Sequence, residues 1–276
     1  MTTSDPSSNE TGLFYREVGK GIPCLVMHGG LGLDHTYFHP ALHPLGDVMR
    51  LVYYDHRGNG QSARPPVEEL TLDRWVDDAD ALRAHLGVER IAVMGHSFGA
   101  CIGMEYALRY PERVSHLLLV EAAPALDYWD EVDEIVANRQ LDPPVREAWQ
   151  TMPTDDAGLG RWLAAVAPLY VHPQSDPAIL SPLMSDVRFN HAAWARSVEV
   201  FNRDFNVTAR LGRIVAPTLV IVGREDFICP PSQANRIRDG IPGAELAIFE
   251  RSGHFPFVEE PDAFFATVRS WLARVS

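Results

Sequence analysis

The sequence of 276 residues has little of several features that would assign it to a particular class of protein. Its three cysteines, Cys24, Cys101 and Cys229, lie far apart and form no C-x-x-C pair. This spacing disfavours both a disulfide framework and a cysteine-based metal site, and reduced thiols in the cytoplasm fit it best. The polar stretch Met1–Gly12 lacks the basic and apolar segments of a signal peptide. No apolar run approaches the ~20 residues needed to cross a bilayer. We therefore expect a cytoplasmic protein.

Basic residues are also scarce. The chain has 24 Lys and Arg against 37 Asp and Glu, which gives a formal net charge of −13 and a pI near 5.2. This charge disfavours binding to nucleic acid or to an anionic membrane surface. With 46% apolar and 22% charged residues, the composition is instead typical of an ordinary globular protein.

Short apolar runs alternate along the chain with segments of helical periodicity. This alternation predicts an α/β fold in which helices cover both faces of a mostly parallel sheet. In the first predicted helix, Trp75, Ala79 and Leu82 share a face that suits packing against a sheet. The predicted strands are Leu13–Val18, Cys24–Met27, Leu51–Tyr54, Ile91–Met94, Leu117–Val120, Thr218–Val222 and Leu246–Phe249. The predicted helices are Leu72–Leu86, Phe98–Tyr110, Pro231–Ile237 and Asp262–Arg274.

The alternation stops between Glu121 and Arg213, where helical patches, many prolines and scattered aromatic residues occur. This stretch is too long for a structureless loop, so we predict a helical insertion over one end of the sheet. Most of its aromatic side chains should fill the core of the insertion, and one or two should line a pocket. These aromatic residues are Tyr128, Trp129, Trp149, Trp162, Tyr170 and Trp194.

A serine lies at a predicted turn between a strand and a helix, in the pentapeptide Gly95-His96-Ser97-Phe98-Gly99. The two glycines suit a tight elbow, because a β-carbon at either position would crowd the neighbouring backbone. Such an elbow holds the serine hydroxyl above the edge of the sheet, where a base and a carbonyl group can reach it. The pattern therefore makes Ser97 a candidate nucleophile.

A serine nucleophile at neutral pH requires a base, usually histidine, and the base requires an acid. Asp226 and His254 each follow a predicted strand, and the chain order Ser, Asp, His is the one expected with this elbow. Because the carboxyl ends of parallel strands meet at one edge, Ser97, Asp226 and His254 can converge there. Glu225 and Glu121 also follow predicted strands, so both remain alternative acids.

The segment His28-Gly29-Gly30 follows another predicted strand and leaves backbone N–H groups free at the same edge. The N–H groups of Gly30 and Phe98 are the candidate donors of an oxyanion hole.

Other conspicuous residues receive structural interpretations. We expect His96 to point away from the face of the serine and His28 to bond within its own loop. His35, His39 and His43 have no accompanying ligand set, so no metal site is predicted. Cys229 should pack as a small apolar residue.

Five motifs in this order resemble those of the α/β-hydrolase superfamily over nearly the whole chain. They are His28-Gly29-Gly30, Tyr54-Asp55-His56-Arg57-Gly58-Asn59-Gly60-Gln61-Ser62, the serine elbow, Gly223-Arg224-Glu225-Asp226 with Pro230, and Gly253-His254. The resemblance implies an α/β-hydrolase fold with a sheet of about eight strands. It also implies a core formed by residues 1–122 and 211–276, a helical cap (lid) at 123–210, and no cofactor.

The subgroups that look closest are esterases and lactonases, including N-acyl-homoserine lactonases, and the proline iminopeptidases. A serine at the elbow excludes ordinary haloalkane dehalogenases and epoxide hydrolases, which use an aspartate there. In iminopeptidases the His-Gly-Gly loop usually continues with proline, whereas Leu31 occupies that position here. We therefore expect a small-molecule ester or lactone substrate with an apolar acyl part.

Two other functions stay open. Acidic residues in the first half of the insertion are suited to binding the ammonium group of an iminopeptidase substrate, although a solvated helix face also explains them. These residues are Asp127, Asp130, Glu131, Asp133, Glu134, Asp142 and Glu147. A hydrolase-fold receptor that binds a ligand and turns over slowly would keep the same catalytic residues.

Overall fold

The computed structural model describes residues 2–3 and 10–275. Most of the stretch Met1–Gly12, for which the sequence predicts no signal peptide, lies outside these residues, as does residue 276. In the described part, one sheet contains seven strands of at least five residues and the two-residue edge strand β1. The strands are β1 Thr2–Thr3, β2 Tyr15–Gly19, β3 Ile22–Met27, β4 Met49–Tyr54, β5 Ile91–His96, β6 Val114–Val120, β7 Thr218–Gly223 and β8 Glu245–Phe249.

The strand order is β1-β2-β4-β3-β5-β6-β7-β8. The pairs β1·β2 and β2·β4 are antiparallel, and the remaining pairs are parallel. The carboxyl ends of β3, β5, β6, β7 and β8 therefore meet at one edge, which brings together loops that are distant in sequence. This sheet confirms the predicted fold class.

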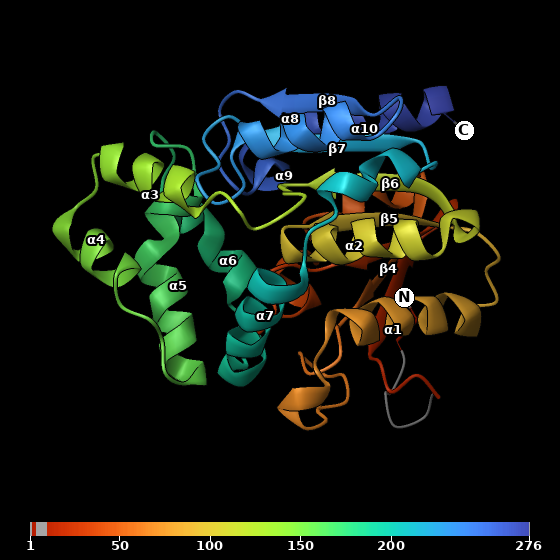
Figure 1. Ribbon diagram of the computed structural model, residues 1–276, viewed down its shortest axis with the longest axis horizontal. Helices are drawn as coiled ribbons and strands as arrows, with labels where there is room; N and C mark the ends of the chain where they lie inside the picture. Colours follow the sequence, from red (N-terminus) through yellow and green to blue (C-terminus); the bar gives the residue numbers. More distant parts are fainter. Residues whose placement is uncertain (1, 4–9, 276) are drawn as a thin grey trace.

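Helices cover both faces of the sheet (Figure 1). The α-helices are α1 Leu72–His85, α2 Phe98–Arg109, α3 Trp129–Asn138, α4 Pro143–Trp149, α5 Asp156–Tyr170, α6 Ser181–Met184, α7 His191–Asp204, α8 Pro231–Gly240, α9 Pro256–Glu259 and α10 Pro261–Val275.

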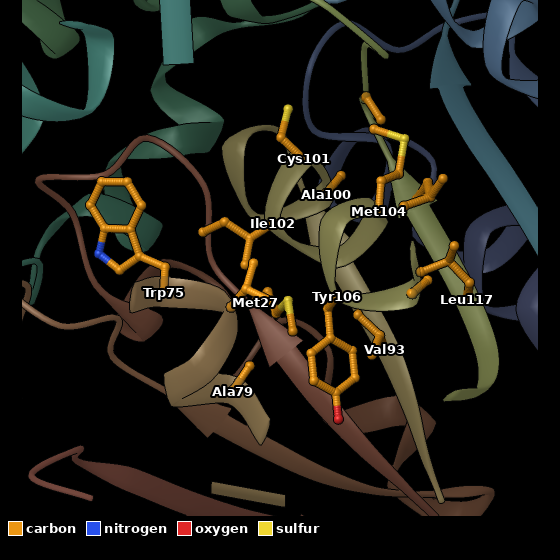
Figure 2. Close-up of a cluster of buried hydrophobic side chains, with 14 of the residues drawn as sticks. Met27, Trp75, Ala79, Val93, Ala100, Cys101, Ile102, Met104, Tyr106 and Leu117 are labelled. Carbon is orange, nitrogen blue, oxygen red and sulfur yellow. The ribbon is translucent and has the colours of Figure 1, made fainter. Parts of the chain in front are cut away.

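The side chains of the central strands alternate between two cores. Leu25 and Met27 of β3 belong to a buried cluster that includes α1, α2 and α8, whereas Cys24 and Val26 belong to a cluster that includes α10. Figure 2 shows the first cluster, in which Met27 lies near Ile102 of α2. Because both faces are covered, strands such as β3 and β7 are almost continuously apolar rather than alternating apolar and polar.

Helices α3–α7 occupy the stretch where the sequence predicts a helical insertion, and they gather at one end of the sheet (Figure 1). The longer helices begin at capping side chains: Asp155 accepts a hydrogen bond from the Gly158 N–H in α5, and Asn190 accepts one from the Ala193 N–H in α7. In residues 2–3 and 10–275, no helix combines the length and apolar character needed to span a membrane.

The predicted strands and helices are all present, with ends that differ by a few residues. The largest differences are three residues, at the start of β6 and at the end of α8. Strand β2 begins at Tyr15 rather than Leu13, since the Phe14 N–H is taken by the Ser62 hydroxyl at 2.9 Å. Strand β5 continues two residues beyond the predicted end at Met94, because its parallel pairing with β6 continues to His96.

Candidate active site

The predicted elbow is present between β5 and α2. Ser97 has φ 55° and ψ −124°, a conformation that costs a residue with a β-carbon of order 1–3 kcal/mol. The flanking glycines permit the close approach that holds it. A β-carbon on Gly99 would overlap the carbonyl oxygen of Met27, and one on Gly95 would lie 2.5 Å from the Ala100 Cα. The backbone thus keeps Ser97 strained at the carboxyl edge of the sheet.

Asp226 and His254 meet at this edge from the loops after β7 and β8. The Asp226 Oδ2 lies 2.8 Å from the His254 Nδ1, and both side chains are buried. The other carboxylate oxygen accepts hydrogen bonds from the backbone N–H groups of Ile228 and Cys229. Burial acts to raise the pKa of Asp226, but the charge of His254 and these hydrogen bonds outweigh it and lower the pKa to about 2. Asp226 is therefore ionised at neutral pH and fixes the His254 ring.

The loop of His254 is also held by its neighbours. The His254 N–H donates to the Tyr170 carbonyl at the end of α5, at 2.8 Å. The Gly253 N–H donates to the Glu259 Oε2 at 2.7 Å. The position of His254 therefore depends on the insertion as well as on the sheet.

The two alternative acids lie in different surroundings. Glu225 is 38% exposed, and its carboxylate lies 3.7 Å from the Arg139 guanidinium. Glu121 is fully buried after β6, and its Oε1 accepts the Gly223 N–H at 2.8 Å. Burial, followed by the neighbouring carboxylate of Asp226, raises the pKa of Glu121 well above its ordinary value. The raised pKa favours the neutral form of Glu121, whose Oε2 has no hydrogen-bond partner among the described residues.

The backbone N–H groups of Gly30 and Phe98 accompany Ser97 around the same cavity. In the described part of the chain neither of these two N–H groups has a hydrogen-bond acceptor. Phe98 is the first residue of α2, where an N–H has no partner within the helix. The His28 Nδ1 donates to the Gly29 carbonyl at 3.0 Å, as expected for a bond within its own loop. Because a trans peptide directs its C=O and N–H oppositely, this bond also sets the direction of the Gly30 N–H.

The prediction that His96 points away from the serine face is wrong. Its ring centroid lies 4.6 Å from that of His254, its Nε2 lies 2.8 Å from the His254 carbonyl, and it lines the same cavity as Ser97. The extension of β5 by two residues is the reason, because it carries His96 to the edge where the loops converge.

His35, His39 and His43 have local roles. The His35 Nδ1 lies 2.7 Å from an Asp55 oxygen, so this pair braces the loop after β3. Asp34 also approaches both groups, but its two oxygens already accept backbone N–H groups. His39 packs edge-on against His43 with a centroid distance of 4.3 Å.

Buried and half-buried histidines predict a loss of stability in acid. Burial, together with nearby cations and histidines, lowers the pKa of His39 to about 4, and burial and the charge of His254 lower that of His96 to about 3. Unfolded histidines titrate at about pH 6.5, so below that pH these histidines bind more protons in the unfolded chain than in the folded one. We expect the free energy of unfolding in urea to fall steadily between about pH 6.5 and about pH 4. The variant His39→Gln should reduce this slope, and a flat profile in the wild-type chain would contradict the expectation.

Ser97 and His254 both line one cavity of about 680 Å³ between the sheet edge and helices α3–α7. The Ser97 hydroxyl makes no hydrogen bond with any other described side chain or backbone group. The expectation that one or two aromatic residues of the insertion line the pocket is wrong, because all six do. Their spacing along the sequence could not show this, since it does not tell which face of each helix turns toward the sheet. The six are Tyr128, Trp129, Trp149, Trp162, Tyr170 and Trp194.

The acidic residues of the insertion mostly face elsewhere. In the described chain, Asp133 is the one carboxylate that lines the cavity. Asp127 pairs with Arg236 at 2.7 Å, and Glu131 accepts a hydrogen bond from the Ser232 hydroxyl. The charge in the first half of the insertion therefore serves partly to attach it to α8.

Comparison with known proteins shows the family to which this chain belongs. The model of the alpha/beta hydrolase fold family matches residues 23–261, so the chain belongs to this family and is a hydrolase of this fold. It is 32% identical to the proline iminopeptidase PfmaB of Pestalotiopsis fici, over 96% of this chain and 98% of the relative. One similar solved structure is that of Est816, described as an N-acyl homoserine lactone degrading enzyme. It is 25% identical to this chain with a TM-score of 0.73, and the match covers 94% of this chain and 96% of the Est816 chain. A hydrolase from Pseudomonas aeruginosa PA01 is 26% identical with a TM-score of 0.77, and covers 98% of this chain and 97% of its own.

Proposed function

We propose that the chain is a serine hydrolase that cleaves carboxylic esters or lactones through an acyl-enzyme on Ser97. One observation carries this proposal: the strained Ser97 and His254, which is bonded to Asp226, line the same cavity. In this assignment His254 is the general base and Asp226 is the acid that orients it. The amides of Gly30 and Phe98 form the oxyanion hole.

The reaction has two acyl-transfer steps. The His254 Nε2 takes the proton from the Ser97 hydroxyl as the serine oxygen attacks the carbonyl carbon. The two amides stabilise the oxyanion, and the C–O bond breaks when His254 returns the proton to the leaving alkoxide. Water then attacks the acyl-enzyme with His254 again as base, and Ser97 regains its proton. The hydrogen bond from Ser97 to His254 forms with substrate in place, since catalytic hydrogen bonds often tighten only in the complex.

The character of the cavity supports an apolar substrate. Aromatic and aliphatic side chains of helices α3–α7 and of their connecting loops line most of it, including Trp149, Trp162 and Phe189. Such a lining favours a neutral acyl chain, because it offers few polar partners to a charged one. The activity described for Est816 makes N-acyl-homoserine lactones candidate substrates. We further propose that residues 123–210 act as a cap over this site.

The likeness to PfmaB keeps a proline iminopeptidase activity as the second candidate. That activity requires an anionic group to bind the substrate ammonium, and Asp133 is the carboxylate that this cavity offers. A receptor function is the third candidate, and steady-state turnover together with labelling of Ser97 by a fluorophosphonate separates it from the first two.

The substrate class is tested with the wild-type chain and the variant Asp133→Asn. We expect hydrolysis of p-nitrophenyl acyl esters and of acyl lactones, with little cleavage of proline anilides. Because a neutral substrate does not use the carboxylate, Asp133→Asn should change kcat/KM for the esters by less than about threefold. Brisk cleavage of proline anilides with a KM that rises in Asp133→Asn would establish the iminopeptidase instead.

A further inference from the structure

Three buried hydrogen bonds connect the loops that carry the proposed catalytic groups. The Gly29 N–H lies 2.6 Å from the Tyr37 hydroxyl oxygen. The same oxygen lies 2.9 Å from the His96 Nδ1. The His96 Nε2 then lies 2.8 Å from the His254 carbonyl oxygen. The side chains of Tyr37 and His96 are each only 2% exposed, so no bulk solvent competes for these bonds.

The partners determine where each proton lies. A carbonyl oxygen only accepts, so the His96 Nε2 must carry the proton that bonds to His254. A neutral His96 then has an acceptor at Nδ1, to which the Tyr37 hydroxyl donates. The tyrosine oxygen is left to accept the Gly29 N–H. Burial lowers the pKa of His96 to about 3, which keeps the ring neutral and this arrangement intact at neutral pH.

We propose that Tyr37 and His96 are positioning residues that hold the oxyanion loop and the His254 loop in register with the Ser97 elbow. The inference rests on the proposed serine-hydrolase function. Gly29 adjoins the oxyanion donor Gly30, His96 adjoins the nucleophile, and the last bond ends on the backbone of the base itself. The chain of bonds therefore joins the loop after β3, the end of β5 and the loop after β8, which no direct backbone ladder connects at these positions.

The geometry near Ser97 makes small displacements costly. A β-carbon on Gly29 would lie 2.8 Å from the Ser97 Cβ, so the oxyanion loop packs directly against the nucleophile. An oxyanion donor acts only when it lies within hydrogen-bond distance of the developing charge. A shift of about 1 Å in catalytic groups can lower a rate by about a hundredfold. We call these three hydrogen bonds, from Gly29 through Tyr37 and His96 to His254, the bridge. Loosening either end of the bridge should therefore lower kcat more than it weakens substrate binding.

The test compares Tyr37→Phe with Tyr54→Phe. Both hydroxyls are buried, but the Tyr54 hydroxyl has no hydrogen-bond partner in the described chain, so its removal breaks no bond. For Tyr37→Phe we expect kcat for an ester to fall by tenfold to about a hundredfold, with KM within about twofold. Labelling of Ser97 by a fluorophosphonate should slow in parallel. Tyr54→Phe should leave both rates unchanged, and thermal unfolding should show that both variants are folded.

Two variants of His96 separate the two halves of the bridge. In His96→Asn the side-chain oxygen can still accept from Tyr37 but cannot reach His254, whereas in His96→Gln the amide nitrogen can still donate to the His254 carbonyl. Each variant should have a lower kcat than the wild type. Adding Tyr37→Phe should lower kcat more in His96→Asn than in His96→Gln, because His96→Asn keeps the hydrogen bond from Tyr37. Unchanged kcat in a folded Tyr37→Phe overturns the inference while leaving the proposed function intact. A different result, hydrolysis that survives Ser97→Ala, would contradict the proposed function itself.

Discussion

Ser97→Ala is expected to lower kcat on esters by roughly a millionfold, because removal of the nucleophile leaves only the oxyanion donors and substrate binding. The variant should still bind substrate, since the cavity lining is unchanged. Steady-state hydrolysis by protein purified free of host esterases measures this loss, and intact mass after incubation with a fluorophosphonate shows whether Ser97 was the labelled group.

A second variant at the same position separates catalysis from folding. Ser97 has a positive φ of 55°, which glycine adopts without the cost imposed by a β-carbon. Ser97→Gly should therefore be as inactive as Ser97→Ala but more resistant to thermal unfolding. Turnover retained in both purified variants would contradict the assignment of the nucleophile.

Asp226→Asn is expected to lower kcat by about ten-thousandfold, because an amide cannot stabilise the imidazolium and favours the wrong tautomer of the base. Glu121→Gln should change kcat by less than about threefold, since the raised pKa of Glu121 favours an uncharged side chain and the amide oxygen can still accept the Gly223 N–H. Both substitutions nearly preserve side-chain shape, so the comparison reports on charge rather than packing.

The comparison of these two variants distinguishes the acids directly. If Glu121→Gln lost activity by orders of magnitude while Asp226→Asn kept it, Glu121 would be the acid that serves His254. Circular dichroism and urea unfolding on both variants show whether a lost rate reflects a lost fold.

The local signals at the serine elbow were sufficient to predict it. Two glycines around Ser97, an apolar strand before it and a helix after it describe one backbone geometry, and β5 and α2 have that geometry. Asp226 and His254 could be placed at the same edge because both follow strands of a parallel sheet. Such inferences succeed when a short segment carries its own steric requirements.

Other features depended on contacts between distant segments. Nothing near Glu121 in the sequence shows that the pKa of its carboxyl group is raised, because the shift follows from burial beside Asp226, more than a hundred residues away. The bond of His96 to the His254 loop depends on the extended β5 ladder, and the convergence of six aromatic side chains on one cavity depends on how α3–α7 pack.

The fold class, the elbow and the order of the candidate catalytic groups could be predicted from the amino-acid sequence, because periodicity and glycine placement act over a few neighbouring residues. The raised pKa of Glu121, the hydrogen bonds that join Gly29, Tyr37, His96 and His254, and the lining of the cavity follow from tertiary contacts. Those properties arise from desolvation and hydrogen bonding between segments that are far apart in the chain, and their strength depends on distances that no local pattern encodes.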